Sequence, residues 1–296
     1  MKTFVIAEIG VNHNGCIHLA KKMIKNAKFC GADAVKFQSF IASNLVSNKA
    51  RLANYQKKNF HKDSMIDLLK KYELTNKEQI ILYKFCKKIK IEFLSSVFDE
   101  ESLDFLISKL KVEKIKIPSG ELNNLPLLIR IAKAKKTTFL STGMANLKEI
   151  KTAIKILNKN GLKKSELTIM HCNSAYPTPM KDANLRSIAF LKQKLGMKVG
   201  YSDHTLGVES SIAAVTLGAE VVEKHFTLNK KLKGPDHSTS LMPKEFKQMI
   251  SYIRNIERGL GIYSKIVTKS EKVNINLVRK SIVAKKNILK GEKFKI

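Results

Sequence analysis

Short apolar runs alternate along the chain with longer stretches in which apolar residues recur every three or four positions. The short runs are rich in β-branched and aromatic residues and predict strands, whereas the longer stretches predict amphipathic helices. Asn146, followed three residues later by Glu149, predicts a capped helix start, and Pro243 suits a first helical turn. The predicted strands cover 3–8, 33–38, 92–95, 114–117, 137–141, 167–171, 198–201 and 220–225, and the predicted helices cover 17–30, 75–90, 100–110, 125–134, 147–160, 185–195, 207–217 and 243–259.

Eight strand–helix units ending near residue 260 match the size of a (β/α)8 TIM barrel, an α/β fold. Two segments interrupt the alternation. Residues 42–62 are polar and predict a loop over the barrel mouth. We expect a barrel domain over 1–261, a linker over 262–278 and the start of a further small domain over 279–296.

Strand alternation points two lysines toward the barrel axis. Val35 and Phe37 suit the helix-facing side, so Lys36 and Gln38 face inward, and the isoleucines on either side of Lys116 give the same result. A buried lysine is costly unless an anion or hydrogen bonds compensate its charge. The two lysines therefore predict a bound anion, and structural Lys–Glu ion pairs are the alternative.

Two histidines, His204 and His225, fall at the ends of the seventh and eighth predicted strands. Neighbouring strands lie about 4.8 Å apart, so both imidazoles can reach one cation. Two histidines leave positions for water or substrate oxygen, which suits a catalytic Lewis acid such as Mn²⁺, Co²⁺ or Zn²⁺. Asp203 or Glu223 would then orient a ligand, and the alternative is two hydrogen-bonded core histidines.

The composition is that of a globular protein, with 44% hydrophobic and 27% charged residues among 296. The 55 Lys and Arg exceed the 25 Asp and Glu by 30, but the excess is spread along the chain as lysine pairs, which favours a solvated lysine surface over a nucleic-acid face. The four cysteines have no metal-finger spacing, and the N-terminus has no apolar signal core. We therefore expect a cytoplasmic protein that binds neither nucleic acid nor membranes.

Long motifs at the predicted strand ends carry a resemblance that runs in order over nearly the whole barrel. They are AEIGVNHNG (7–15), AVKFQSF (34–40), KIPSGELNNLP (116–126), LSTGMA (140–145), HCNSAYPTP (171–179), GYSDHTLG (200–207), EKHFTL (223–228) and GPDHSTS (234–240). Together they resemble the bacterial N-acetylneuraminate (sialic acid) synthase family. The legionaminate and pseudaminate synthases are near relatives of that family.

The resemblance implies a metal-dependent condensation of phosphoenolpyruvate with an N-acylated hexosamine. N-acetylmannosamine is the foremost sugar, giving N-acetylneuraminate and phosphate, and a related acylated sugar in a legionaminate- or pseudaminate-type synthase is the alternative. The implied metal is Mn²⁺, with Co²⁺ or Mg²⁺ as substitutes.

The resemblance also assigns roles to residues of this chain. His204 and His225 match the Mn²⁺ ligands, and Gln38, Tyr176 and Asp236 match sugar-binding positions. Glu8 and Glu121 are the candidate catalytic carboxylates, and the choice between them stays open. The phosphoenolpyruvate pocket is matched by Lys36, Ser96, Lys116, Ser119, Ser141 and Ser202.

Members of this family continue into an antifreeze-like domain that covers the partner's active site in a homodimer. An arginine of that domain reaches the sugar's N-acyl group, and here only residues 279–296 match the domain's beginning. A homodimer is thus implied, with a catalytically impaired truncated barrel as an alternative. Two other functions remain open: a Schiff-base aldolase using Lys36 or Lys116, and a basic, inactive barrel that binds nucleic acid.

Overall fold

Eight parallel strands close into a single barrel in the computed structural model, which describes residues 2–46 and 65–293. Each strand pairs with the next along the chain, and β8 pairs with β1. The predicted (β/α)8 barrel is therefore confirmed. The strands are β1 (Phe4–Gly10), β2 (Ala34–Ser39), β3 (Glu92–Val97), β4 (Lys114–Ile117), β5 (Thr137–Ser141), β6 (Leu167–Cys172), β7 (Lys198–Asp203) and β8 (Val221–His225).

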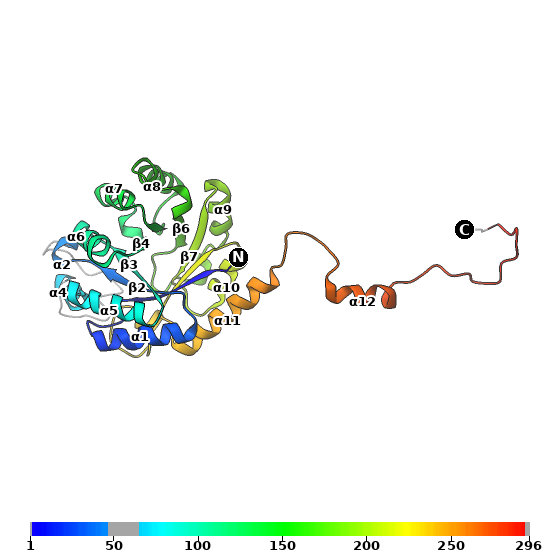
Figure 1. Cartoon of the computed structure of the whole chain (residues 1–296), viewed down its shortest axis with the longest axis horizontal. Coiled ribbons are helices and arrows are strands. Elements are labelled where there is room, and N and C mark those ends of the chain that lie inside the picture. Colours follow the sequence, from blue (N-terminus) through cyan, green and yellow to red (C-terminus); the bar gives the residue numbers. More distant parts are fainter. Residues whose placement is uncertain (1, 47–64, 294–296) are drawn as a thin grey trace. The chain divides into compact units, whose positions relative to one another are not determined.

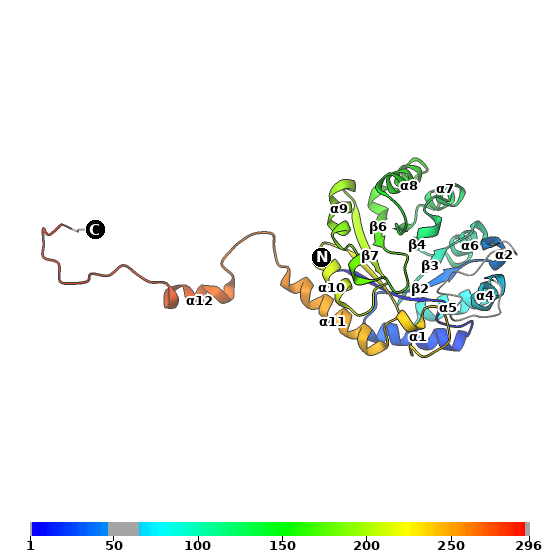
Figure 2. The same ribbon diagram turned by 180° about the vertical axis from the view of Figure 1, so that it is seen from behind.

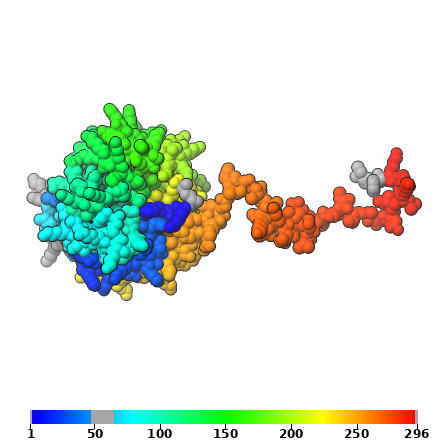
Figure 3. Space-filling view, in the orientation of Figure 1, coloured from blue at the N-terminus to red at the C-terminus, as the bar shows by residue number. Residues whose placement is uncertain are grey.

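Helices follow the strands and surround the barrel, as the views from both sides show (Figures 1 and 2). Segments in the colours of α4 to α8 and α11 form most of the visible surface of this unit (Figure 3). The helices of this unit are α1 (Ile17–Cys30), α2 (Ala42–Leu45), α4 (Met65–Tyr72), α5 (Asn76–Lys88), α6 (Glu100–Phe105) with its π-helical continuation Leu106–Leu110, α7 (Leu125–Ala134), α8 (Leu147–Lys159), α9 (Arg186–Leu195), α10 (Glu209–Thr216) and α11 (Pro243–Gly259). A further helix, α12 (Lys269–Val278), belongs to a separate unit of the chain.

Local sequence signals explain where several helices begin. The Asn146 side chain accepts the backbone N–H of Glu149, and the Glu149 carboxylate accepts the backbone N–H of Asn146, so the predicted cap of α8 is confirmed. Pro243 occupies the first turn of α11, where its missing N–H costs no hydrogen bond. Along α8 the buried positions recur at helical spacing, which places one apolar face against the strands.

The barrel interior contains two layers of inward-facing side chains. One, here called the apolar layer, consists of Ile6, Ala34, Leu94, Phe139, Met170 and Val221. Two residues further along most of these strands lie the side chains of a polar layer: Glu8, Lys36, Ser96, Lys116, Ser141, Ser202 and Glu223. Because side chains alternate along a strand, both layers come from the same face of the sheet. The outward-facing residues pack with the helices in a separate, larger core.

Two segments differ from the sequence prediction. The loop predicted over 42–62 begins with helix α2, and residues 47–62 of it lie outside the described residues. Helix α4 was not predicted, and neither was α12, which lies in the segment expected to be a linker.

The chain divides into one compact unit over Met1–Leu260 and a second over Gly261–Ile296. Within the described ranges, no helix is both long and apolar enough to cross a membrane.

Candidate active site

The carboxyl ends of the barrel strands surround a cavity of about 330 Å³. This is the end of the fold at which such barrels carry their chemistry. The site residues predicted from the sequence line the cavity, with the exceptions of Glu121, Asp203 and Asp236. The remaining lining residues are Phe98, Pro118, Gly120, Met144, Cys172, Ser174 and Glu223.

Four buried charges of the polar layer form a network at the floor of this cavity. The Lys36 ammonium lies 2.7 Å from a Glu8 oxygen and 3.8 Å from Glu223. Lys116 reaches across the barrel from β4 to β8 and lies 2.8 Å from Glu223. The Lys–Glu ion pairs weighed in the sequence analysis are therefore present, and two lysines with two glutamates leave the group formally neutral.

The two glutamates of this network have opposite pKa shifts. Burial raises the pKa of Glu8 to about 7, although the Lys36 charge partly opposes the shift. Burial acts on Glu223 too, but the charges of Lys116 and Lys36 and a hydrogen bond from Ser202 lower its pKa to about 2. Near neutral pH Glu223 is therefore a fixed carboxylate, whereas Glu8 can accept or release a proton.

Hydroxyl groups surround the lysines. Lys36 donates a hydrogen bond of 2.6 Å to the Ser96 hydroxyl, and Ser202 donates one of 2.9 Å to Glu223. Ser119 accepts the backbone N–H of Gly143 at 3.0 Å. A Cβ atom on Gly143 would lie 2.8 Å from the Ser119 oxygen and 2.4 Å from that of Ser174, so a larger residue here would displace these two hydroxyls.

The two predicted metal ligands come together at the cavity wall. The ring centres of His204 and His225 lie 5.5 Å apart. His204 Nδ1 donates to the Asn173 carbonyl at 2.5 Å, so its Nε2 presents a lone pair, which accepts the Tyr176 hydroxyl at 3.0 Å. Burial lowers the pKa of His204 to about 4 and that of His225 well below its usual value. Both rings are therefore neutral at pH 7, the state in which imidazole binds metals.

These features fit a divalent cation. With nitrogen–metal bonds of about 2.1 Å, two imidazoles on one ion have ring centres roughly 4.5–5.5 Å apart, as here. The Nδ1 atom of His225 is buried without a hydrogen-bond partner, which is costly unless another group binds there. Among the described residues, no three His, Cys, Asp or Glu side chains form a metal site. A bound cation would therefore complete its coordination with oxygen atoms of water or substrate.

The remaining predicted residues lie at different distances from this centre. Asp236 lies outside the cavity lining, but one of its oxygens is 3.7 Å from His225 Nδ1, and burial raises its pKa to about 6. Glu121 sits in the 3-10 turn Ser119–Glu121 and accepts a hydrogen bond of 2.7 Å from Asn124. Of the two candidate catalytic carboxylates, the cavity therefore contains Glu8.

Glu223 is the central residue whose importance the sequence interpretation missed. It was considered only as a group that orients a metal ligand, whereas it contacts both lysines. Glu223 lies two residues before His225 on the same strand, so both side chains are on the same face of the sheet. Strand alternation therefore places Glu223 inside the barrel, and this could have been read from the sequence. Phe98 and Met144 come from loops after β3 and β5, for which no such pattern exists.

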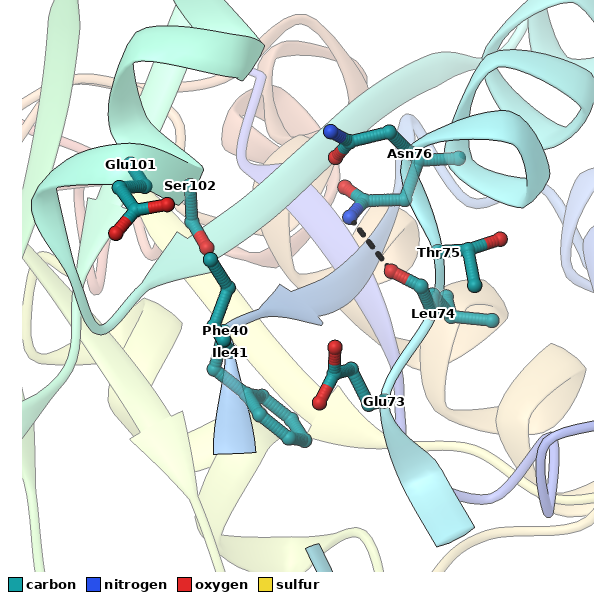
Figure 4. Close-up of a pocket in the computed structure, with 9 residues that line it drawn as sticks. Phe40, Ile41, Glu73, Leu74, Thr75, Asn76, Glu101 and Ser102 are labelled. Carbon is teal, nitrogen blue, oxygen red and sulfur yellow. Dashed lines mark hydrogen bonds between the residues drawn. The ribbon is translucent and has the colours of Figure 1, made fainter. Parts of the chain in front are cut away.

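A second cavity, of about 350 Å³, lies outside the barrel between the β2–α2 connection, the start of α5 and α6 (Figure 4). Its buried polar groups already have partners. Gln79 donates to the Leu74 carbonyl at 3.0 Å and accepts from Ser39, and the Glu73 carboxylate accepts the backbone N–H of Ala42. Among the described residues that line it, there is no histidine or lysine.

Comparison with known proteins agrees with this geometry. Residues 23–265 match the NeuB family. The chain is 51% identical to the N,N'-diacetyllegionaminic acid synthase of Campylobacter jejuni, covering 99% of this chain and 88% of that protein. It is 43% identical to the protein of the same name from Legionella pneumophila, covering 98% and 82%.

A solved structure shows the same architecture. The N-acetylneuraminic acid synthetase of Leptospira borgpetersenii, in complex with citrate, superimposes with a TM-score of 0.84 at 34% identity. The match covers 94% of this chain and 91% of that one, so it includes the barrel and its mouth.

Proposed function

Because this chain belongs to the NeuB family and is a synthase, we propose that it condenses phosphoenolpyruvate with an N-acylated hexosamine, giving a nine-carbon 2-keto acid and phosphate. The observation that carries the proposal is the joint presence of two inward lysines and two neutral imidazoles in one cavity. The lysines suit a small anionic substrate, and the imidazoles suit a cation that activates a carbonyl group.

The sugar that we propose carries two acylamino groups. Both legionaminic acid synthases compared above bear the N,N'-diacetyl prefix in their product names, and their identity to this chain exceeds that of the sialic acid synthetase. N-acetylmannosamine, with N-acetylneuraminate as its product, is the second candidate, because the sequence motifs resemble that synthase family as well.

Phosphoenolpyruvate would be held by Lys36 and Lys116. Its phosphate and carboxylate groups would replace part of the glutamate contacts of the two ammonium groups. The hydroxyls of Ser96, Ser119 and Ser202, and that of Ser141, would donate hydrogen bonds to the same oxygens. Holding the enol carbon in register with the sugar aldehyde supplies a large share of the rate acceleration.

A divalent cation, Mn²⁺ by preference and Co²⁺ or Mg²⁺ as substitutes, would be held by His204 and His225. When bound, it supplies Lewis acidity that polarises the aldehyde of the open-chain sugar. The Asn173 carbonyl contributes by keeping the hydrogen on His204 Nδ1, so that Nε2 remains available. Gln38, Tyr176 and Asp236 would contact the sugar.

Glu8 is the proposed general base. As the enol carbon attacks the aldehyde carbon, positive charge develops at the neighbouring carbon, to which water adds. The attack turns the aldehyde oxygen into an alkoxide. The Glu8 carboxylate takes a proton from the added water, and this proton neutralises the alkoxide. The tetrahedral species then forms the ketone by breaking its bond to the phosphate oxygen, and its hydroxyl proton leaves with the phosphate. A pKa of about 7, raised by burial, suits this transfer at neutral pH.

A Schiff-base aldolase is the less favoured function. That chemistry needs a lysine amine with a lowered pKa. Although burial opposes the charge of Lys36, its carboxylate neighbours Glu223 and Glu8 outweigh burial and raise the pKa, which keeps the amine protonated. Lys116 is likewise held in an ion pair with Glu223.

A phosphate-release assay tests the proposal. The protein is incubated with Mn²⁺, phosphoenolpyruvate and each of several acylated hexosamines, with a His204→Ala variant and a sugar-free reaction as controls. We expect the fastest release with a mannose derivative that carries two acetamido groups. Faster release with N-acetylmannosamine would make this chain an N-acetylneuraminate synthase. No release with any sugar would overturn the proposal and favour an impaired barrel.

Three further proposals come from the family resemblance. We propose a cytoplasmic homodimer and place the start of an antifreeze-like domain over 279–296, after a linker over 262–278. Sedimentation analysis of the purified chain tests the dimer, and a single species of about 33 kDa would exclude it.

A further inference from the structure

A second buried ion pair joins β7 to β8, on the face of the sheet opposite the cavity. The Lys224 ammonium lies 2.9 Å from an Asp203 oxygen, and the side chains are 1% and 0% exposed. The two residues are register partners in the parallel ladder. The preceding residues Ser202 and Glu223 point inward and are hydrogen-bonded to each other. The Asp203–Lys224 ion pair therefore lies directly behind the polar layer, on the outer face of the same two strands.

The Lys224 side chain contacts the residue before His204 and the residue after it. It pairs with Asp203, the residue before the histidine, and donates to the backbone carbonyl of Thr205, the residue after it, at 2.5 Å. Asp203 in turn accepts the backbone N–H of Thr205 at 2.8 Å and its hydroxyl at 2.7 Å. Lys224 itself directly precedes His225 in the sequence.

These contacts hold the chain together just beyond the last residue pair of the β7–β8 ladder. Strand β7 ends at Asp203, and the register with β8 ends at the pair Asp203–Lys224, so His204 lies one residue beyond the ladder. The hydroxyl of Ser211, from α10, donates to Asp203 at 2.6 Å and fixes the carboxylate from the helix side. A buried charged pair of this kind is costly to misalign, because a shifted strand leaves each charge unpaired.

We propose that Lys224 and Asp203 are positioning residues that clamp His204 and His225 at the separation required to bind one cation. The inference rests on the proposed function, because it presupposes that the two imidazoles bind a metal. The clamp acts through the backbone: it fixes the segment that carries His204 against the strand that carries His225, and it touches neither substrate nor metal.

Binding of Mn²⁺ alone tests the clamp. The dissociation constant is measured from the electron paramagnetic resonance signal of free Mn²⁺ with the full chain and its Lys224→Met and Asp203→Asn variants. We expect both variants to bind at least about tenfold more weakly, the usual effect of removing groups that orient metal ligands. Lys114→Met is the matched control, because Lys114 also forms a cross-strand ion pair, with Glu92 at 3.0 Å, remote from the histidines. Its affinity should stay within about twofold of the wild type.

Thermal unfolding in EDTA separates a positioning role from a purely structural one. Variants that unfold at lower temperature but retain the wild-type Mn²⁺ affinity would overturn the clamp and leave the proposed function intact. Absence of Mn²⁺ binding in the wild type itself would overturn the metal site and the clamp together.

The double variant Asp203→Asn/Lys224→Met should lose no more affinity for Mn²⁺ than Lys224→Met alone. Additive losses would contradict a shared role of the two residues.

Discussion

The apolar and polar layers of the barrel interior lie two residues apart on the same strands, yet they are stabilised in opposite ways. The apolar layer gains free energy by leaving water and needs no specific partner. The polar layer loses hydration, and two kinds of contact compensate. Lys36 pairs with Glu8 and Lys116 with Glu223, and serine hydroxyls add hydrogen bonds to these charges. A group of paired charges is a poor means of stabilising a barrel. This agrees with the role in substrate binding and catalysis that we propose for these residues.

The largest expected effect comes from removing a candidate metal ligand at the mouth. We expect His225→Ala to reduce metal-dependent product formation by at least about a thousandfold, equivalent to roughly 4 kcal/mol of transition-state stabilisation. Truncation of this buried ring also removes its contacts with Tyr176 and His204, so urea unfolding is measured alongside activity. Turnover at the wild-type rate in this variant would refute the ligand assignment. Circular dichroism checks that the barrel remains folded.

In the apolar layer, the equivalent change should affect stability instead. Phe139 is 3% exposed and its ring stacks on Phe4. We expect Phe139→Ala to lower the free energy of unfolding by about 3–5 kcal/mol because it leaves a cavity. Urea unfolding measures this, and Phe29→Ala, at a position 75% exposed, is the control. The KM for phosphoenolpyruvate should not change. An increase as large as that expected for Lys116→Met would contradict the assignment of stability to the apolar layer and of substrate binding to the polar layer.

Removing one charge of the polar layer should affect one substrate selectively. We expect Lys116→Met to raise the KM for phosphoenolpyruvate about 30-fold, a value typical of a lost charge-assisted contact, with a much smaller effect on the sugar. Lys114→Met changes the same residue type two positions earlier on β4, where the side chain is partly exposed, and should leave both values unchanged. Equal effects on both substrates would exclude a role in holding the phosphate.

Acid should lower the stability of the protein through His13, which is buried in the turn after β1, whereas the apolar layer contains no titratable group. Burial lowers the pKa of His13 to about 4, and its Nδ1 accepts the backbone N–H of Gly15 at 3.0 Å. Between pH 6.5 and 4 the unfolded chain therefore binds more protons at this ring than the folded one. Its contribution to the free energy of unfolding should fall by about 2 kcal/mol from pH 7 to pH 5. Urea unfolding at both values checks this, and the loss should be smaller in His13→Gln.

Sequence patterns predicted the regular elements well where one face is buried. The eight strands and the capped start of α8 follow from local periodicity and hydrogen-bonding groups. Helix α12 buries no residue, so it has no apolar face to signal it, and α4 is too short for a firm periodic pattern. The helix predicted over 207–217 begins later, at Glu209, since the preceding turn holds Gly207 at a positive φ.

The chain by itself determined which side chains face the barrel axis. A strand has a period of two residues, so the isoleucines beside Lys116 fix its inward direction wherever the strand lies. The motifs that place His204 and His225 at strand ends are equally local.

Only the tertiary structure decided which of these groups meet. Lys116 contacts a glutamate 107 positions away because closure of the barrel brings β4 and β8 to opposite walls of one narrow interior. Burial inside the closed barrel raises the pKa of Glu8, whereas the charges of Lys116 and Lys36 lower that of Glu223. Electrostatic interaction depends on distance and burial, which a linear pattern does not contain until the sheet closes.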